Sequence, residues 1–236
     1  MDIKVGQLPS RIKDGCLLDT IVNLHYMSEF SQSTVEETIE EKLNSLAGGS
    51  LFAKIPVIEK GEVVKGRIFF ANDVYRIMVV DDILSFNIVK TYPTWPHYRD
   101  FVRDVIRAVL DKITITHVDV RYLSHFGDIP LFDNIDGSIM LAHLQAFQGA
   151  RYSFQCNVTD EIPGRIPAQA TVNLTDRNQV APGQLESIID IAVVSGVNMG
   201  VALDDIMRTL DFVHICEKHL FFTIISDAFY NQLKVD

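Results

Sequence analysis

The alternation of apolar and polar residues is most regular between residues 67 and 122, where it predicts a strand meander, a helix and a returning strand. Two short runs, Val74–Val80 and Ile83–Lys90, alternate and are joined by Asp81-Asp82. Asn72-Asp73 follows the short strand Arg67–Ala71, and Asn and Asp in such two-residue connections tolerate positive φ and suit tight hairpins. The second run has one apolar and one polar side, which is typical of an antiparallel strand with one buried face. Its apolar side consists of Leu84, Phe86 and Ile88.

A helix is predicted after the break at Tyr92–Pro96, because the apolar residues change from period two to helical spacing. Thr94 is the expected N-cap, and proline in the first helical turn forfeits only a hydrogen bond that is not formed there anyway. Arginines recur every four residues on the polar side, and an aspartate lies three positions before the next arginine, so we expect local ion pairs. The expected buried stripe is Tyr98, Phe101, Val102, Val105, Ile106 and Val109, and the polar row is Arg99, Asp100, Arg103, Asp104 and Arg107.

Weaker patterns predict elements on both sides of this segment. Leu17–Met27 alternates as a strand, and Ser33 with Glu36 forms a capping-box pattern at the start of a helix that we expect to end at Gly48-Gly49. Further strands are expected at Leu51–Ile58, Arg67–Ala71, Ala150–Thr159, Ala168–Leu174 and Leu185–Val194.

The remaining segments are predicted to be loop and a terminal helix. Phe126–Gln148 has the irregular, Gly- and Pro-containing composition of a loop, and Thr175–Gly183 reads as a polar connection. A helical pattern runs from Ala202 to about Leu233, and Thr223–Asp227 is the place where it could break. Unbroken, this helix would be roughly 45 Å long at about 1.5 Å per residue.

These elements together predict an α+β fold, with an antiparallel sheet or sheets, helices packed on one face and a long C-terminal helix. We expect a single domain spanning residues 1–236, because no low-complexity segment or linker divides the chain. A two-lobed organisation that divides near residue 125 is the alternative.

Composition narrows the possible functions. The chain has 236 residues, 47% of them apolar and 22% charged, and a formal net charge of −10. Such acidity argues against a general affinity for nucleic acid, which requires clustered Lys and Arg, although it also serves simply to keep a protein in solution. We expect no general nucleic-acid binding and no membrane association.

The cysteines and the N-terminus predict a cytoplasmic protein. Cys16, Cys156 and Cys216 are widely separated and include no CxxC pair, which favours reduced thiols over a disulfide framework. The first residues lack the apolar segment of a signal peptide, and no window has the apolar length of a membrane-spanning helix.

Four short motifs give the chain a resemblance to known proteins. They are Ile83-Leu-Ser-Phe-Asn87, Tyr92-Pro-Thr-Trp95 at the start of a helix, Val120-Arg121-Tyr122 at a strand end, and Phe222-Thr-Ile-Ile-Ser-Asp227. With these motifs the chain resembles a sporadically distributed family of prokaryotic proteins to which no activity is assigned. It departs from that family after Tyr122, where Leu123-Ser124-His125 replaces an Asn-containing continuation. The resemblance implies a shared architecture, and the family's distribution suggests a role in defence, including antiviral defence, or in toxin neutralisation.

The candidate catalytic or ligand-binding residues lie on the returning strand. His117, Asp119 and Arg121 are two residues apart, so their side chains emerge on one face while Val118 and Val120 enter the other. A base, an acid and a fixed cation on one surface are what acid–base chemistry or anion binding uses, and a small enzyme or ligand-binding domain would place them in a cleft between the sheet and the long helix. The alternative is the solvated face of an antiparallel strand.

Other catalytic or metal-binding patterns are weak. His214 and His219 are five residues apart, whereas metal ligands on one helical face favour spacings of three or four. No nucleophile motif or phosphate-binding loop occurs in the sequence, so we expect no cofactor and no metal. Loop residues that could converge in a cleft are His125 with Asp128, and His143 with Asp133 or Asp136.

Absence of such motifs favours a non-catalytic protein that acts through a protein partner or through self-assembly into a homo-oligomer. Tyr92 and Trp95 are candidate aromatic anchors for a partner, with packing of the start of the helix onto the sheet as the alternative. The acidic residues of the predicted helix 33–46, among them Glu37, Glu40 and Glu41, form a second candidate surface, with a solvated helix face as the alternative.

Overall fold

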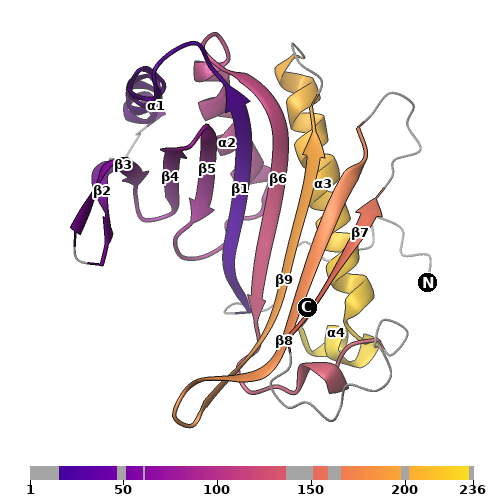
Figure 1. Ribbon diagram of the computed structural model, residues 1–236. Coiled ribbons are helices and arrows are strands. Elements are labelled where there is room, and N and C mark those ends of the chain that lie inside the picture. Colours follow the sequence, from indigo (N-terminus) through magenta and orange to yellow (C-terminus); the bar gives the residue numbers. More distant parts are fainter. Residues whose placement is uncertain are drawn as a thin grey trace. The chain divides into compact units, whose positions relative to one another are not determined.

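The computed structural model describes residues 16–46, 52–60, 62–136, 151–158, 166–197 and 202–233, and it has an α+β fold of antiparallel strands with helices (Figure 1). Its contacts divide the chain into two compact units. Unit 1 comprises Met1–Thr20, Val120–Val194 and Phe212–Asp236, and unit 2 comprises Ile21–Asp119 and Ser195–Asp211. The strands β1, β6 and β9 and the helix α3 each contribute residues to both units. Whether the chain folds as one domain stays a prediction.

Unit 2 contains a meander, the helices α1 and α2, and the start of α3. Its strand order is β2-β3-β4-β5-β1-β6, and the neighbours from β2 to β1 pair antiparallel. The elements are β1 (Leu17–Met27), α1 (Gln32–Leu46), β2 (Ala53–Glu59), β3 (Glu62–Ala71), β4 (Tyr75–Val80), β5 (Ile83–Ile88), α2 (Trp95–Val109) and β6 (Thr114–His125).

The β4–β5 hairpin follows directly from its turn residues. Asp81 and Asp82 have φ angles of 49° and 60°, the conformation that a two-residue turn requires if it is to match the twist of its strands. The sequence prediction of this hairpin is confirmed. At the preceding β3–β4 turn the Asn72 side chain accepts hydrogen bonds from the backbone N–H groups of Val74 and Tyr75, at 2.8 and 2.7 Å.

Helix α2 covers the apolar face of this meander, as the sequence predicts. The Tyr98 hydroxyl donates a 2.6 Å hydrogen bond to the carbonyl of Phe86, and the rings of Phe101 and Tyr75 stack with centroids 4.0 Å apart. Burial of Leu84, Phe86 and Ile88 confirms the predicted apolar side of β5, and the predicted stripe of α2 is buried except for Phe101, which is partly exposed.

Helix α1 begins one residue earlier than its predicted cap. It starts at Gln32, and the Ser31 hydroxyl, not that of Ser33, accepts a hydrogen bond from the backbone N–H of Thr34 at 3.3 Å. The capping-box prediction is therefore wrong in register, because Ser31 lies three residues before an N–H group that has no partner within the helix. The predicted stop at Gly48-Gly49 lies outside the described residues.

Unit 1 has the strand order β6-β9-β8-β7. Its remaining elements are η2 (Leu131–Asp133), β7 (Arg151–Val158), β8 (Ala168–Ala181), β9 (Gln184–Gly196), α3 (Leu203–Ile224) and α4 (Asp227–Leu233).

The predicted polar connection Thr175–Gly183 is wrong, because β8 continues to Ala181 and turns into β9 through Pro182-Gly183. At the base of this part of the strand, one polar residue, Asp176, finds its partner in a neighbouring loop. The buried Asp176 carboxylate accepts a 2.6 Å hydrogen bond from the backbone N–H of Leu131. Gly183 takes a φ of 76°, a conformation that glycine adopts at little cost.

The terminal helical pattern breaks where the sequence allowed it, between Ile224 and Asp227. Ile225 forms an antiparallel bridge with Ile135. Backbone groups that leave the helix at this break therefore bond to the segment 134–136 instead. The Ser226 hydroxyl then accepts a 3.2 Å hydrogen bond from the N–H of Phe229 and caps α4. Among the helices described here, none combines the length and the apolar character needed to cross a bilayer.

We predict that Tyr98→Phe lowers the free energy of unfolding by about 0.5–1.5 kcal/mol, because it removes a buried hydrogen bond to the Phe86 carbonyl. Urea unfolding followed by circular dichroism measures this change. Tyr75→Phe is the matched control, since the Tyr75 ring stacks on the same helix and its hydroxyl has no hydrogen bond within the described chain. Equal losses in both variants would contradict a specific role for the Tyr98 hydroxyl.

Candidate functional site

The predicted alternation along β6 is present in the structure. Val118 and Val120 are buried, whereas His117 and Arg121 are exposed and Asp119 is partly buried. The row is shared between the units, because His117 and Asp119 belong to unit 2 and Arg121 to unit 1. Asp119 is hydrogen-bonded to residues of unit 2, and Arg121 to residues of unit 1.

In unit 2, Asp119 forms a polar network with two residues of β1. The Asn23 amide donates to Asp119 Oδ1 at 3.0 Å, and His25 Nε2 lies 2.9 Å from Asp119 Oδ2. The side chain of Asp119 is 16% exposed and that of His25 is 38% exposed. Because an ionised carboxylate only accepts hydrogen bonds, this contact places a proton on Nε2 and orients the imidazole. We call these three residues the Asn23–Asp119–His25 network.

His117 lies beside this network. Its ring meets the ring of His25 edge-on, with centroids 6.1 Å apart, and its Nδ1 is 3.1 Å from the hydroxyl of Thr116. Two imidazoles and one carboxylate therefore occupy neighbouring positions on β1 and β6. Within the described parts of the chain, no group of three or more His, Cys, Asp or Glu side chains is arranged to hold a metal ion.

The network belongs to the face of the unit 2 sheet that points away from α2. Asn23 pairs with Ser85, which alternates with the buried Leu84 and Phe86 of β5, and residues directly paired across strands share a face. We call this surface the outer face. The strand register places on it Ile21, Asn23 and His25 of β1, Ile83, Ser85 and Asn87 of β5, Arg76, Met78 and Val80 of β4, and Phe69 of β3, in addition to His117 and Asp119.

In unit 1, Arg121 is already neutralised. It binds Asp190 of β9 through two hydrogen bonds of 2.8 and 2.9 Å, and the Asn173 amide donates to the same carboxylate at 3.3 Å. The next residue, Tyr122, points the other way and its hydroxyl lies 3.1 Å from Nδ1 of His214 on α3. A cleft between the sheet and the long helix therefore does not include Arg121, because α3 packs on the opposite side of β6.

The aromatic residues at the start of α2 make contacts within unit 2. The indole N–H of Trp95 donates to Asp211 of α3 at 3.0 Å, and the rings of Trp95 and Tyr92 approach Tyr98 edge-on at 6.2 and 6.4 Å. Both side chains are partly buried. This arrangement matches the packing alternative, whereas a role for Tyr92 and Trp95 in binding a partner stays a prediction.

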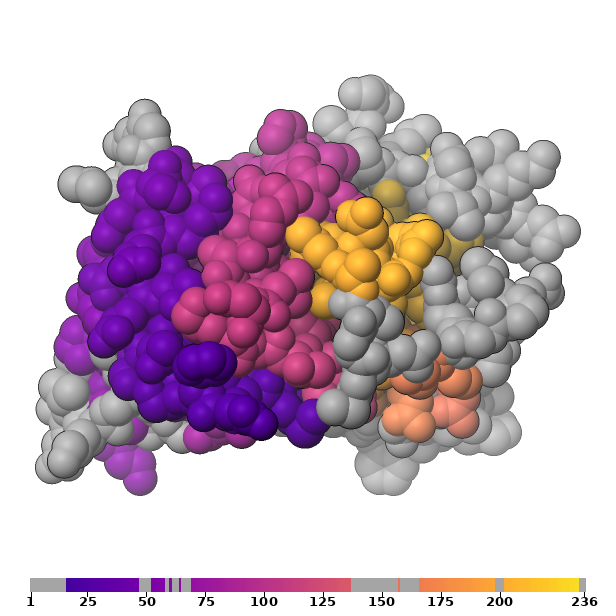
Figure 2. All heavy atoms as spheres, turned by 90° about the horizontal axis from the view of Figure 1, so that it is seen from above, coloured from indigo at the N-terminus to yellow at the C-terminus, as the bar shows by residue number. Residues whose placement is uncertain are grey.

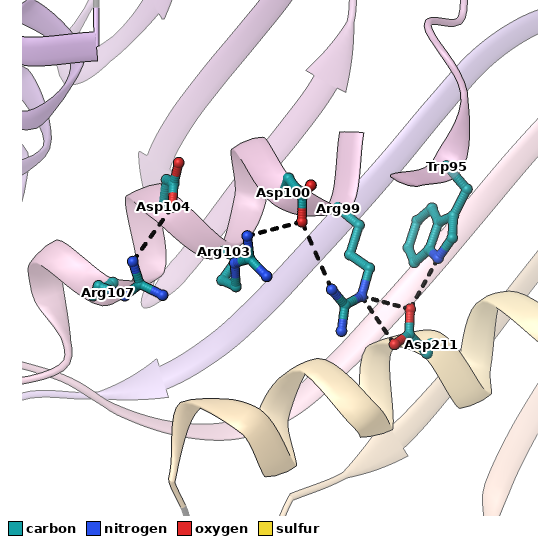
Figure 3. Close-up of polar contacts among 7 residues, drawn as sticks. All are labelled: Trp95, Arg99, Asp100, Arg103, Asp104, Arg107 and Asp211. Atoms are coloured by element: carbon teal, nitrogen blue, oxygen red, sulfur yellow. Dashed lines mark hydrogen bonds and ion pairs between the residues drawn. The ribbon is translucent and has the colours of Figure 1, made fainter. Parts of the chain in front are cut away.

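Asp211 also binds the arginine row of α2 (Figure 3). Both of its oxygens accept hydrogen bonds from Arg99 Nε, at 2.8 and 2.9 Å. The start of α3, drawn in yellow, accordingly lies beside the magenta segment that contains α2 in Figure 2. The predicted local ion pairs are present as well, with Arg103 to Asp100 at 3.0 Å and Arg107 to Asp104 at 3.7 Å.

The acidic residues of α1 point to solvent. Glu37 and Glu41 are exposed, and Glu40 pairs with Lys54 of β2 at 2.8 Å with both side chains more than a third exposed. Contacts across such exposed pairs contribute little to stability. Their role in partner binding stays a prediction.

Two ionisable groups of α3 are buried in unit 1. Burial, with Lys218 as a smaller contribution, lowers the pKa of His214 to about 3. Burial raises the pKa of Glu217 to about 8, against the opposing effect of Lys218. Both groups are therefore largely uncharged at neutral pH.

Of the two loop histidines named from the sequence, the structure describes His125 alone. His125 Nε2 lies 3.8 Å from a carboxylate oxygen of Glu186, which replaces Asp128 as its acidic neighbour. Asp133 and Asp136 are exposed, and His143 lies outside the described residues.

Sequence reasoning missed the acidic and polar partners of the candidate residues. Asn23 and His25 alternate with the buried Val22 and Leu24, so the sequence assigns them to the second side of their strand. Nothing in the sequence indicates that β1 lies beside β6. Asp190 and Asp211 carry no local signal, because their partners are 69 and 112 residues away.

We predict that Asp211→Asn destabilises the protein by about 1–2 kcal/mol, because the Arg99 guanidinium then loses the charged carboxylate whose two oxygens accept from its Nε. Thermal unfolding measures this effect. Asp100→Asn is the matched control, because Asp100 is 56% exposed and its ion pairs lie on the solvent side of α2, where removal costs under about 0.5 kcal/mol. A drop in Tm no larger than that of the control would contradict the role of Asp211.

We predict that Glu217→Gln removes a loss of stability that the wild type shows between pH 4.5 and about 8. The pKa of Glu217 is higher in the folded protein than its ordinary value of 4.5, so this group's stabilising contribution is complete below pH 4.5 and is lost as pH rises through about 8. Urea unfolding between pH 5 and 9 should show a steeper fall for the wild type up to about pH 8, by about 1.4 kcal/mol per pH unit. Glu29→Gln, at an exposed position, is the control. Parallel curves for wild type and Glu217→Gln would refute the assignment.

Comparison of the chain with protein-family models and with curated proteins gives no match. The resemblance to a prokaryotic family therefore stays a prediction.

Proposed function

We propose that this protein is a non-catalytic binding protein that recognises a partner protein through the outer face of unit 2. The observation that carries the proposal is the Asn23–Asp119–His25 network, a set of oriented polar groups among partly exposed apolar side chains. Protein recognition surfaces combine apolar contact area with a small number of fixed polar groups that set specificity.

The apolar part of the surface follows from the strand register. Met78 of β4 lies opposite Ser85 of β5, and Ser85 lies opposite Asn23 of β1. The apolar side chain of Met78 is therefore in the same cross-strand row as the Asn23–Asp119–His25 network. Ile83 likewise lies opposite both His25 and Val80. These apolar side chains are partly exposed, and a flat partner surface that covers them would gain the free energy of apolar burial.

Charge on this surface favours a partner with acidic groups. Asp119 is hydrogen-bonded by Asn23 and His25 within the sheet, whereas Arg76 is exposed and lies over the Phe69 ring at 4.9 Å. An arginine held on an aromatic ring presents a fixed cation to a partner and is a frequent centre of binding energy in protein interfaces.

We prefer the outer face as the partner-binding surface to the two surfaces expected from the sequence. Trp95 and Tyr92 make intrachain contacts with Asp211 and Tyr98, which leaves less of their surface for a partner. Glu37, Glu40 and Glu41 remain the competing surface, and variants there serve as a test.

A second candidate function is acid–base chemistry or small-ligand binding at the same network. Asp119 orients the His25 imidazole through Nε2, which leaves Nδ1 to exchange a proton or a hydrogen bond with a ligand, and His117 stands next to it. The site residues of this second candidate are His117, Asp119 and His25, whereas the sequence hypothesis named Arg121 in place of His25.

The biological process that we propose is prokaryotic defence or toxin neutralisation, which rests on the family resemblance of the sequence. A captured partner that is itself a toxin or a phage protein would support this process. A partner from central metabolism would contradict it.

We predict that Asp119→Asn and Arg76→Glu each weaken capture of the partner by about tenfold or more, because they remove the centre and the cation of the outer face. The full-length tagged protein is used to capture partners from the source cells, and the dissociation constant is then measured by calorimetry with the purified partner. Asp111→Asn, at an exposed carboxylate near the end of α2, is the matched control and should bind normally.

The pattern among variants separates the candidates. Loss of capture in Glu37→Ala/Glu41→Ala, with normal capture in both outer-face variants, would refute the proposed surface. If Asp119→Asn and His25→Ala abolish binding of a small molecule while Arg76→Glu has no effect, the ligand-binding candidate is favoured.

A further inference from the structure

The turn between β8 and β9 lies at the end of a hairpin that continues beyond the rest of its sheet (Figure 1). The pairing of β7 with β8 ends at Thr175. On the other side of the hairpin, the N–H of Ser187 in β9 donates to the carbonyl of Gly127. Beyond these points the described chain places no strand beside the hairpin. We call residues 178–185, which form its end, the arm.

The base of the arm is held by buried polar groups. Asp176 accepts a hydrogen bond from the N–H of Leu131, and the Ser187 hydroxyl donates to the carbonyl of Ile129 at 2.6 Å. The same hydroxyl accepts from the N–H of Arg177 at 2.9 Å, across the two strands of the hairpin. These three bonds fix the direction in which the arm leaves unit 1.

The arm itself is exposed and uncharged. Its sequence, Asn-Gln-Val-Ala-Pro-Gly-Gln-Leu, contains no ionisable side chain, in a chain of net charge −10. Val180 is 47% exposed and Leu185 is 38% exposed. Because the turn has two residues, Val180 stands opposite Leu185 on the same face of the hairpin, and the two form a small apolar patch.

An isolated two-stranded ribbon with free edges is marginally stable in water and is a template for another strand. Within the described chain its edge N–H and C=O groups have no strand beside them and match those of an extended segment, while its apolar patch gains from being covered. The arm therefore has the properties of a strand-pairing site.

We propose that the occupant of this site is the arm of a second copy of the chain, which pairs edge to edge with it about a two-fold axis. Two copies of an acidic protein repel each other, and an uncharged projecting segment is where their approach costs least. Pairing of identical arms is isologous, so each arm receives the same neighbour and the assembly closes as a dimer.

This inference does not depend on the proposed function. The arm belongs to unit 1 and the outer face to unit 2, so partner capture and self-association are separate measurements. A variant that loses partner capture can still be tested for self-association, and the reverse also holds.

The test is the mass of the full-length protein in solution, measured by sedimentation equilibrium over a range of concentrations. The wild type is expected at twice its chain mass of 26.6 kDa. Val180→Glu/Leu185→Glu should raise the dimer dissociation constant by about tenfold or more, because it places charges in the paired arms. Met27→Glu/Phe30→Glu is the matched control, with equal added charge at side chains that are 48% and 51% exposed outside the arm.

Cross-linking provides a second measurement if the charged variant does not fold. Gln179→Cys should form a disulfide-linked dimer under mild oxidation to a greater extent than Gln232→Cys, an exposed control on α4. A monomeric wild type, a dimer unaffected by the charged arm, or equal cross-linking at both positions would each overturn the proposal.

Discussion

Packing of Tyr98 against β5 decides which face of the unit 2 sheet is buried. The phenol ring is fully buried, its hydroxyl donates to the Phe86 carbonyl, and the rings of Tyr75, Tyr92 and Trp95 lie around it. Once α2 covers this side, strand alternation places every second residue on the outer face. The positions of Asn23, His25 and Asp119 on that face are therefore a consequence of the aromatic contact made by the helix.

Acidic residues compensate the chain's cations at several places in the fold. Asp119, Asp190 and Asp211 each bind a basic or amide side chain that is distant in sequence, and each of them is at least partly buried. A partly buried carboxylate is stable only when such donors surround it, so these contacts specify which strands and helices are neighbours. This pairing also explains why Arg121 is not a general anion site, since both of its hydrogen-bonded nitrogens already face Asp190.

The two surfaces that we propose for binding differ in character. The outer face is a broad part of a sheet with an oriented polar centre, whereas the arm is a narrow ribbon that offers backbone groups and a small apolar patch. The first suits recognition of another protein through side chains, and the second suits pairing of identical strands. A protein that uses both would present its recognition surface in duplicate and gain avidity for a multivalent partner.

Local patterns in the sequence determined the elements of this protein: the Asp81-Asp82 hairpin, the stripe of α2 and the alternation of β6 all follow from neighbours a few residues apart. The α+β class followed from them, as did the break of the terminal helix near Ser226. Tertiary structure alone decided that β8 extends through a polar segment, because the partner of Asp176 lies 45 residues away. It also brought Asn23 and His25 to Asp119 across more than 90 residues. Period and propensity report the environment along one strand or helix, whereas the pairing of distant strands depends on packing that no local pattern encodes.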